Sequence, residues 1–257
     1  MFDSHCHLDD ALFDRDRDAA IARARAAGVI GVLVPAIRPR TWPALRALAA
    51  AEPLLRLAIG IHPQIVPELD ADERLDADAI ARAAADAGAC AIGECGLDGG
   101  TADRDGQEQL FRAQLRAARA LGRPVIIHVM RAHDVAPRIL REERVDEVGG
   151  VLHSYSGGAD LVPVYRELGL AFSFAGPVTY PEARRPIAAA RAVPDALLLA
   201  ETDAPDQAPA PHRGGRSEPA YVREVIAGLA RARDQDVAHV AAITTANAQR
   251  LFGGARG

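Results

Sequence analysis

The chain has 257 residues, of which 49% are hydrophobic, and it carries a formal net charge of −5 at pH 7. This hydrophobic fraction is enough for a sizeable core and excludes an intrinsically disordered protein. The excess of acids excludes a broad basic surface of the kind that coats nucleic acid, although bound cations would still allow a nucleic-acid substrate. The sequence contains no lysine, which excludes Schiff-base chemistry and a P-loop.

The same composition indicates a cellular compartment. No apolar run approaches the roughly 18 residues of a membrane span, and residues 1–10 contain acids and histidines where a signal peptide would be apolar. Cys6, Cys90 and Cys95 form no C-x-x-C pair and suit a reducing environment. We therefore expect a cytoplasmic protein that does not bind a membrane, and nothing in the sequence calls for an obligate protein partner.

Eight apolar runs of strand length recur along the chain, separated by helical segments. They cover residues 1–3, 29–35, 55–61, 89–93, 124–128, 150–153, 171–174 and 196–200. Each run is almost continuously apolar, as expected for a buried strand of a parallel sheet. Eight alternating strand and helix units predict an α/β protein with a single (β/α)8 barrel of the TIM type, a fold that takes about 250 residues. We therefore expect residues 1–257 to form one domain.

The helical segments carry their own start and stop signals. Residues 110–121 place apolar side chains three and four positions apart, and Gly122 stands where a C-terminal cap belongs. Ser217 is predicted to cap a later helix that has Pro219 in its first turn. Residues 202–217, rich in proline and glycine, form the longest predicted loop, and a long loop after the last barrel strand is usually functional.

Histidine or acidic side chains stand where five of the predicted strands end. They are His5 and His7 after the first strand, Glu94 after the fourth, His128 at the fifth, His153 at the sixth and Asp203 after the eighth. Imidazoles and carboxylates without thiolates form a ligand set that suits divalent metals in hydrolysis. Because a barrel keeps its chemistry at the carboxyl ends of its strands, we expect these side chains to form a metal site.

Each of these residues also has an ordinary structural interpretation. The histidines could be satisfied by hydrogen bonds at strand ends or in the core, and Glu94 or Asp203 could cap a helix. Their shared position at the strand ends favours the metal interpretation. Charged and imidazole groups gathered there without a cation would repel one another or stay unpaired, which costs several kcal/mol.

Six segments, in their order and spacing, resemble the TatD family of metal-dependent hydrolases, sometimes called TatD-type deoxyribonucleases. They are Asp3-Ser4-His5-Cys6-His7-Leu8, Gly60-Ile61-His62-Pro63, Ile92-Gly93-Glu94-Cys95-Gly96-Leu97-Asp98, Pro124-Val125-Ile126-Ile127-His128, His153-Ser154-Tyr155-Ser156-Gly157 and Glu201-Thr202-Asp203-Ala204-Pro205. The resemblance covers essentially the whole chain. It implies a (β/α)8 barrel that hydrolyses its substrate with divalent metal ions.

The resemblance also implies a role for each matching residue. The implied ion ligands are His5, His7 and Asp203 for one ion, and His128 and His153 for a second, with Glu94 as the bridge between them. Asp203 is expected to orient the attacking water and accept its proton. His62 and Arg213 fall where relatives contact the substrate phosphate, although a loop histidine and a surface arginine are the simpler interpretations.

The metal and the substrate stay open. Zinc, manganese, cobalt, nickel and, less readily, magnesium all suit histidine and carboxylate ligands, so two divalent ions are expected without an identity. The chain departs from the family pattern at Gln64, Val129, Met130 and Ser217, and at residues 99–100, where glycines replace aromatic residues. None of these departures removes an implied metal ligand, but all lie where substrate would be held.

The sequence therefore predicts a metal-dependent hydrolase of ester bonds. The favoured activity is a phosphodiesterase, a deoxyribonuclease of the exonuclease type that acts on DNA through a water activated by two metal ions. A metal-dependent small-molecule esterase or amidohydrolase is an alternative with the same chemistry. A metal-binding barrel without catalytic activity is an alternative of a different class.

Overall fold

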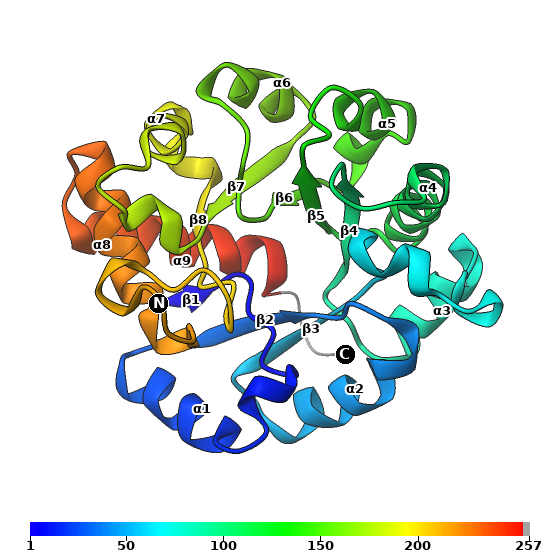
Figure 1. The fold of residues 1–257 in the computed structure, drawn as a ribbon, viewed down its shortest axis with the longest axis horizontal. Coiled ribbons are helices and arrows are strands. Elements are labelled where there is room, and N and C mark those ends of the chain that lie inside the picture. Colours follow the sequence, from blue (N-terminus) through cyan, green and yellow to red (C-terminus); the bar gives the residue numbers. More distant parts are fainter. Residues whose placement is uncertain (254–257) are drawn as a thin grey trace. The chain divides into compact units, whose positions relative to one another are not determined.

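Eight parallel strands alternate with nine α-helices along residues 1–253, the part of the chain that the computed structural model describes (Figure 1). The strands are β1 (Phe2–Asp3), β2 (Gly31–Pro35), β3 (Leu55–Ile59), β4 (Ala91–Asp98), β5 (Val125–Met130), β6 (Gly150–Leu152), β7 (Leu170–Phe174) and β8 (Leu198–Ala200). The helices are α1 (Arg17–Ala26), α2 (Trp42–Ala51), α3 (Ala77–Asp86), α4 (Arg104–Leu121), α5 (Ala136–Glu142), α6 (Val162–Glu167), α7 (Arg184–Ala192), α8 (Val222–Arg233) and α9 (Val237–Phe252). The strands follow the chain order in the sheet, which confirms the predicted (β/α)8 class.

The chain divides into two compact units, of which the first comprises Met1–Val34, Ser154–Val162 and Phe172–Gly253. Within it β1 pairs with β2, and β7 pairs with β8. The Ser4 amide donates to the Ala200 carbonyl at 3.1 Å, so β1 also runs beside β8. Helix α9, red in Figure 1, packs against both strands. This arrangement brings the end of β1 next to the end of β8.

The described residues of the second unit are Pro35–His153 and Pro163–Ala171. Strands β3, β4, β5 and β6 pair in parallel within it, and α3 and α4 pack side by side against them (Figure 1). The predicted apolar face of α4 is buried, with Phe111 and Leu115 each 1% exposed. Gly122 ends this helix in a left-handed conformation (φ 60°), which confirms the predicted glycine cap. The expectation of one domain stays a prediction.

Strand β4 is longer than its apolar run predicts. It was expected to end at Gly93 but continues to Asp98, with a shift in register between Ile92 and Cys95. The extension pairs with β5, where Gly96 lies opposite His128. A Cβ atom on Gly96 would lie 2.0 Å from the His128 carbonyl oxygen, so only glycine allows this close approach. Glu94 therefore lies inside a strand at its irregular point.

The predicted cap at Ser217 is wrong. A 3₁₀ turn at Pro219–Tyr221 precedes α8, and Tyr221 is the residue at the N-cap position. This extra turn separates Ser217 from the first free amides of α8, because a side-chain cap reaches only two or three residues ahead. The Ser217 hydroxyl is buried and, within residues 1–253, has no hydrogen-bond partner.

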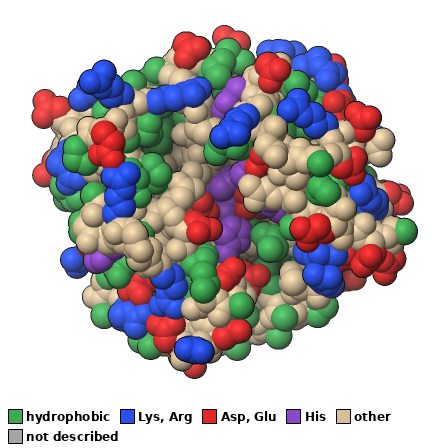
Figure 2. Space-filling model, in the orientation of Figure 1, with side chains coloured by type: hydrophobic (Ala, Val, Ile, Leu, Met, Phe, Trp, Pro, Cys, Tyr) green, Lys and Arg blue, Asp and Glu red, His purple; other side chains and the backbone are tan. Residues whose placement is uncertain are grey.

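Arginine and acidic side chains are interspersed on the face drawn in Figure 2. Many of them pair, as Arg112 does with Glu108, Glu142 and Glu143 at 2.6–2.9 Å. Because an acidic partner balances the positive charge of each paired arginine, these arginines leave little unbalanced positive charge. This agrees with the acidic net charge of the chain. None of the helices in residues 1–253 combines the length and the apolar character needed to cross a bilayer.

Candidate metal centres

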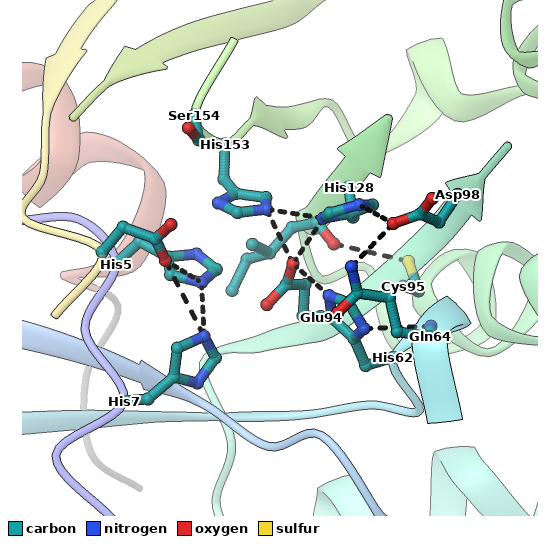
Figure 3. Close-up of polar contacts among 12 residues, drawn as sticks. His5, His7, His62, Gln64, Glu94, Cys95, Asp98, His128, His153 and Ser154 are labelled. Carbon is teal, nitrogen blue, oxygen red and sulfur yellow. Dashed lines mark hydrogen bonds and ion pairs between the residues drawn. The ribbon is translucent and has the colours of Figure 1, made fainter. Parts of the chain in front are cut away.

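One cluster of ligand-type side chains, in the first unit, joins the ends of β1 and β8. The Nε2 atoms of His5 and His7 lie 3.1 Å apart, and Figure 3 shows the two rings directed toward one another. Asp203 Oδ1 lies 3.7 Å from the His5 nitrogen and 3.9 Å from the His7 nitrogen. The main chain fixes this arrangement, because the Asp203 amide donates to the His5 carbonyl at 2.9 Å and the His7 amide to the Ala204 carbonyl at 2.7 Å.

The buried carboxyl group of Asp3 links the same two strand ends, those of β1 and β8. Asp3 accepts hydrogen bonds from the Thr202 amide at 2.9 Å and, on its other oxygen, from the Thr202 hydroxyl at 2.6 Å. Burial raises the pKa of Asp3 to about 8, against the lowering effect of these hydrogen bonds. Sequence reasoning missed this role, although an acid inside an apolar strand is a signal that a buried partner exists.

Asp203 is further held by a residue that the sequence did not single out. The Gln207 side-chain amide donates to Asp203 Oδ2, and its carbonyl oxygen accepts from the Ser154 hydroxyl at 2.9 Å. One Asp203 oxygen therefore faces the two imidazoles while Gln207 binds the other. Gln207 is a positioning residue in this arrangement, because it acts through the Asp203 carboxylate.

We expect Gln207→Leu to lower kcat about 10-fold to 100-fold with little change in KM or in bound metal. Without the amide donor the Asp203 carboxylate can rotate away from its working orientation, and small misplacements of catalytic groups are costly. Steady-state kinetics and metal analysis of the purified variant test this expectation. Gln249→Leu, a change at an exposed glutamine of α9, is the matched control. Equal kcat values for wild type and Gln207→Leu would show that Asp203 does not need this contact.

A second cluster, in the other unit, converges on one carboxylate oxygen. Glu94 Oε1 lies 2.9 Å from His62 Nε2, 3.1 Å from His128 Nδ1 and 2.7 Å from His153 Nε2. The His128 and His153 nitrogens are themselves 3.1 Å apart. Glu94 is 1% exposed, so its carboxyl group is surrounded by imidazoles and hardly accessible to solvent (Figure 3). His62 therefore lies among the ligand-type atoms themselves.

The outer side of His128 rests on a second carboxylate. Asp98 Oδ2 lies 3.3 Å from His128 Nε2 and accepts from the Gln64 side-chain amide at 2.7 Å (Figure 3). Hydrogen bonding from His128 and Gln64 lowers the pKa of Asp98 well below its ordinary value, despite burial. Burial lowers the pKa of His128, but Asp98 and Glu94 outweigh it and raise that pKa. Gln64, a departure from the family pattern, thus supports a predicted ligand.

We expect Asp98→Asn to weaken divalent-metal binding about 10-fold to 100-fold. Carboxylates that orient a histidine ligand raise its basicity, and losing one costs this much in related settings. Isothermal titration calorimetry of metal-stripped protein with manganese or zinc measures the change in metal affinity. Asp146→Asn, at an exposed acid of the same unit, should leave the affinity unchanged. Unaltered affinity in Asp98→Asn would contradict the supporting role of Asp98.

The residues of both clusters fit divalent ions. Nitrogen and oxygen ligands of one ion at about 2.1 Å lie roughly 3.0–3.4 Å from each other. The distances from Glu94 Oε1 to the imidazole nitrogens, 2.7–3.1 Å, and the 3.1 Å between His5 and His7 approach this spacing. Without an ion, the neutral imidazoles of His5 and His7 can be this close only if one nitrogen carries a proton and donates it in a hydrogen bond to the other. The donor set is oxygen and nitrogen only, since none of the candidate ligand groups in residues 1–253 contains a cysteine.

Arg213, predicted to contact substrate phosphate, contacts two other side chains in the structure. Its guanidinium stacks on the Tyr180 ring, 4.1 Å from the centroid, and forms an ion pair with Glu182. The side chain is 56% exposed. The role of Arg213 in substrate binding therefore stays a prediction.

Comparisons with known proteins show the family to which this chain belongs. The family model of TatD-related DNases matches residues 2–253. The uncharacterized metal-dependent hydrolase YabD of Bacillus subtilis is 35% identical over 255 residues, 98% of each chain. The 3'-5' ssDNA/RNA exonuclease TatD of Citrobacter rodentium is 36% identical over 264 residues, again 98% of each chain. The crystal structure of YjjV, a TatD homologue from Escherichia coli, superposes with a TM-score of 0.91 at 30% identity, covering 99% of this chain and 98% of that one.

Fold, ligand clusters and relatives together define a metal-dependent hydrolase built on a TIM-type barrel. Within that class, the chain belongs to the TatD family, which confirms the predicted family.

Proposed function

We propose that this protein is a two-ion phosphodiesterase that removes nucleotides from the ends of single-stranded DNA. The observation that carries the proposal is the convergence of three imidazoles on the buried Glu94 carboxylate. A separate cluster of ligand-type side chains gathers His5, His7 and Asp203. Such paired oxygen and nitrogen sites are typical of enzymes that hydrolyse phosphodiesters. A relative 36% identical to this chain bears the name 3'-5' ssDNA/RNA exonuclease, which favours a nucleic-acid substrate.

The proposed roles follow from the contacts of each residue. Because the carboxyl ends of barrel strands form one catalytic face, we infer that both clusters serve a single phosphodiester. The proposed ion ligands are His5, His7 and Asp203 for one ion, and His128 and His153 for the other, with Glu94 shared. Divalent ions bound there would acidify water and neutralise negative charge on the phosphate. Asp203, oriented by Gln207, would align the attacking water and accept its proton.

Substrate contacts are the remaining part of the proposal. His62, whose Nε2 atom lies 2.9 Å from Glu94 Oε1, would donate a hydrogen bond to a phosphate oxygen. Arg213 would exchange its partner Glu182 for a phosphate, since both are anions that an arginine binds through the same N–H groups.

The test is the release of mononucleotides from end-labelled single-stranded DNA and RNA by protein stripped with EDTA, with each divalent metal added back in turn. Digestion restored by metal would support the nuclease proposal and identify the ions that work. Binding of metal without digestion, but with hydrolysis of a small phosphoester, carboxylic ester or amide, would replace the nuclease by a small-molecule hydrolase. Metal binding without any turnover would reject catalysis altogether.

A further inference from the structure

A cavity of about 220 Å³ lies beside the second metal cluster, within a single unit. Its lining comes from the end of β4, the first turns of α4 and the segment that leads from β5 into α5. Asp98 belongs to this lining and also contacts His128 at 3.3 Å. The cavity therefore adjoins the residues proposed to act on the phosphodiester.

The cavity offers one cation that the protein does not use. Among residues 1–253 the Arg131 guanidinium takes part in no ion pair and no side-chain hydrogen bond. The other two arginines of the lining are engaged: Arg104 donates to the Gly99 carbonyl at 3.1 Å, and Arg138 pairs with Glu142 at 3.1 Å. A free guanidinium with its fork of N–H donors suits a phosphate group.

The rest of the lining suits a flat heterocycle with polar edges. Leu97 and Ala132, 6% and 8% exposed, contribute apolar wall together with Val135. Asp105 and Asp134 also line the cavity, and in the described part of the chain neither carboxylate has an ion pair or a side-chain hydrogen bond. Free carboxylates accept hydrogen bonds from exocyclic amino groups and ring N–H groups of bases.

The size of the cavity limits what it can hold. At about 220 Å³ it falls below the roughly 300–1,000 Å³ of pockets for drug-sized ligands. It therefore has room for one ring system and not for two stacked bases.

We propose that this cavity binds the base of one nucleotide next to the scissile phosphodiester, and that Arg131 binds a phosphate of the same strand. The inference rests on the proposed nuclease function and names the part of the substrate that the cavity recognises. Arg131 is then a specificity-determining residue: it discriminates nucleotides from simple phosphodiesters without holding a metal ion.

Two substrates that share a leaving group test this inference. Thymidine 3'-phosphate 5'-(4-nitrophenyl phosphate) carries a nucleoside and a second phosphate, whereas bis(4-nitrophenyl) phosphate carries neither. We expect Arg131→Gln to raise KM for the thymidine substrate roughly tenfold or more, with kcat within about twofold, and to leave hydrolysis of the simple diester unchanged. Arg131→Lys should restore part of the binding because it keeps the positive charge.

Arg144 provides a matched control. It is an exposed arginine of the same unit and shares the left-handed backbone of Arg131, with φ 53° against 51°, so Arg144→Gln makes the same chemical change in the same conformation away from the cavity. A second variant, Ala132→Leu, fills the cavity without touching charge and should raise the same KM. Thermal melting of each variant confirms that it folds.

Direct binding separates this inference from the proposed function. Equilibrium dialysis with dAMP, with deoxyribose 5-phosphate and with inorganic phosphate reports binding without catalysis. We expect dAMP to bind more tightly than either probe that lacks a base, and both Arg131→Gln and Ala132→Leu to weaken it. That result would support the binding of a nucleotide base in the cavity even if no phosphodiester were hydrolysed. Equal binding of all three probes, or unchanged dAMP binding in both variants, would overturn the inference while leaving nuclease activity intact.

Discussion

Replacing Asp203 with asparagine is expected to lower kcat by about 10²–10⁴-fold while changing the affinity for single-stranded DNA only a few-fold. The amide has almost the same shape, but it is a weak base and cannot accept the proton of the attacking water. Gln207 would still find a carbonyl oxygen at this position, so the loop should keep its conformation. The loss should therefore fall on turnover and not on binding.

Steady-state kinetics, fluorescence anisotropy with a labelled oligonucleotide and metal analysis of the same preparations separate these effects. Asp206→Asn, three positions along the same loop and exposed, is the matched control and should retain most of the activity. A loss of activity caused only by a loss of bound metal would make Asp203 a ligand and not a base. Near-normal turnover in Asp203→Asn with metal bound would contradict both roles.

Removing the ions is expected to lower Tm by roughly 5–10 °C in the wild type and to abolish turnover. A ligand present at 100 times its dissociation constant stabilises the folded state by about 2.7 kcal/mol, and each kcal/mol shifts Tm by roughly 2–4 °C in a protein near this size. In Glu94→Gln most of this difference should disappear. In this variant a neutral amide replaces the buried carboxylate that three imidazoles surround, and an amide binds a divalent ion poorly.

Melting curves recorded with manganese, with zinc and with EDTA measure the effect. Glu167→Gln, which neutralises an exposed acid in the same unit, should keep the full difference between the metal-bound and stripped forms. Identical melting temperatures with and without EDTA in the wild type, under conditions where the protein turns over substrate, would contradict metal dependence of this cluster.

Most of the fold follows from local sequence patterns. The eight strands lie where continuous apolar runs predict them, and α4 ends at the predicted glycine, because buried strands and capped helices leave signals within a few residues. The continuation of β4 to Asp98 could not be predicted in this way. It depends on the close approach of Gly96 to His128, two residues that are far apart in the sequence.

The candidate site was likewise predictable only where local sequence patterns identify its residues. The six predicted ligands are histidines and acids that end or follow apolar runs, and each of the two clusters gathers the ones that its unit contains. Asp98 and Gln207 were not predicted because their roles depend on which loop folds over which strand. The same reasoning explains the error at Ser217, since an intervening 3₁₀ turn decides where α8 begins.

The central claim, that two ions act together in phosphodiester hydrolysis, is tested most directly by measuring turnover against the number of ions bound. Metal-stripped protein is titrated with manganese, free and bound metal are separated by dialysis, and digestion of single-stranded DNA is measured at each point. We expect activity to follow the fraction of chains that carry two ions, and to stay near zero in His5→Ala, which keeps only the Glu94 cluster intact. Full activity with one ion per chain, or in His5→Ala, would contradict the claim.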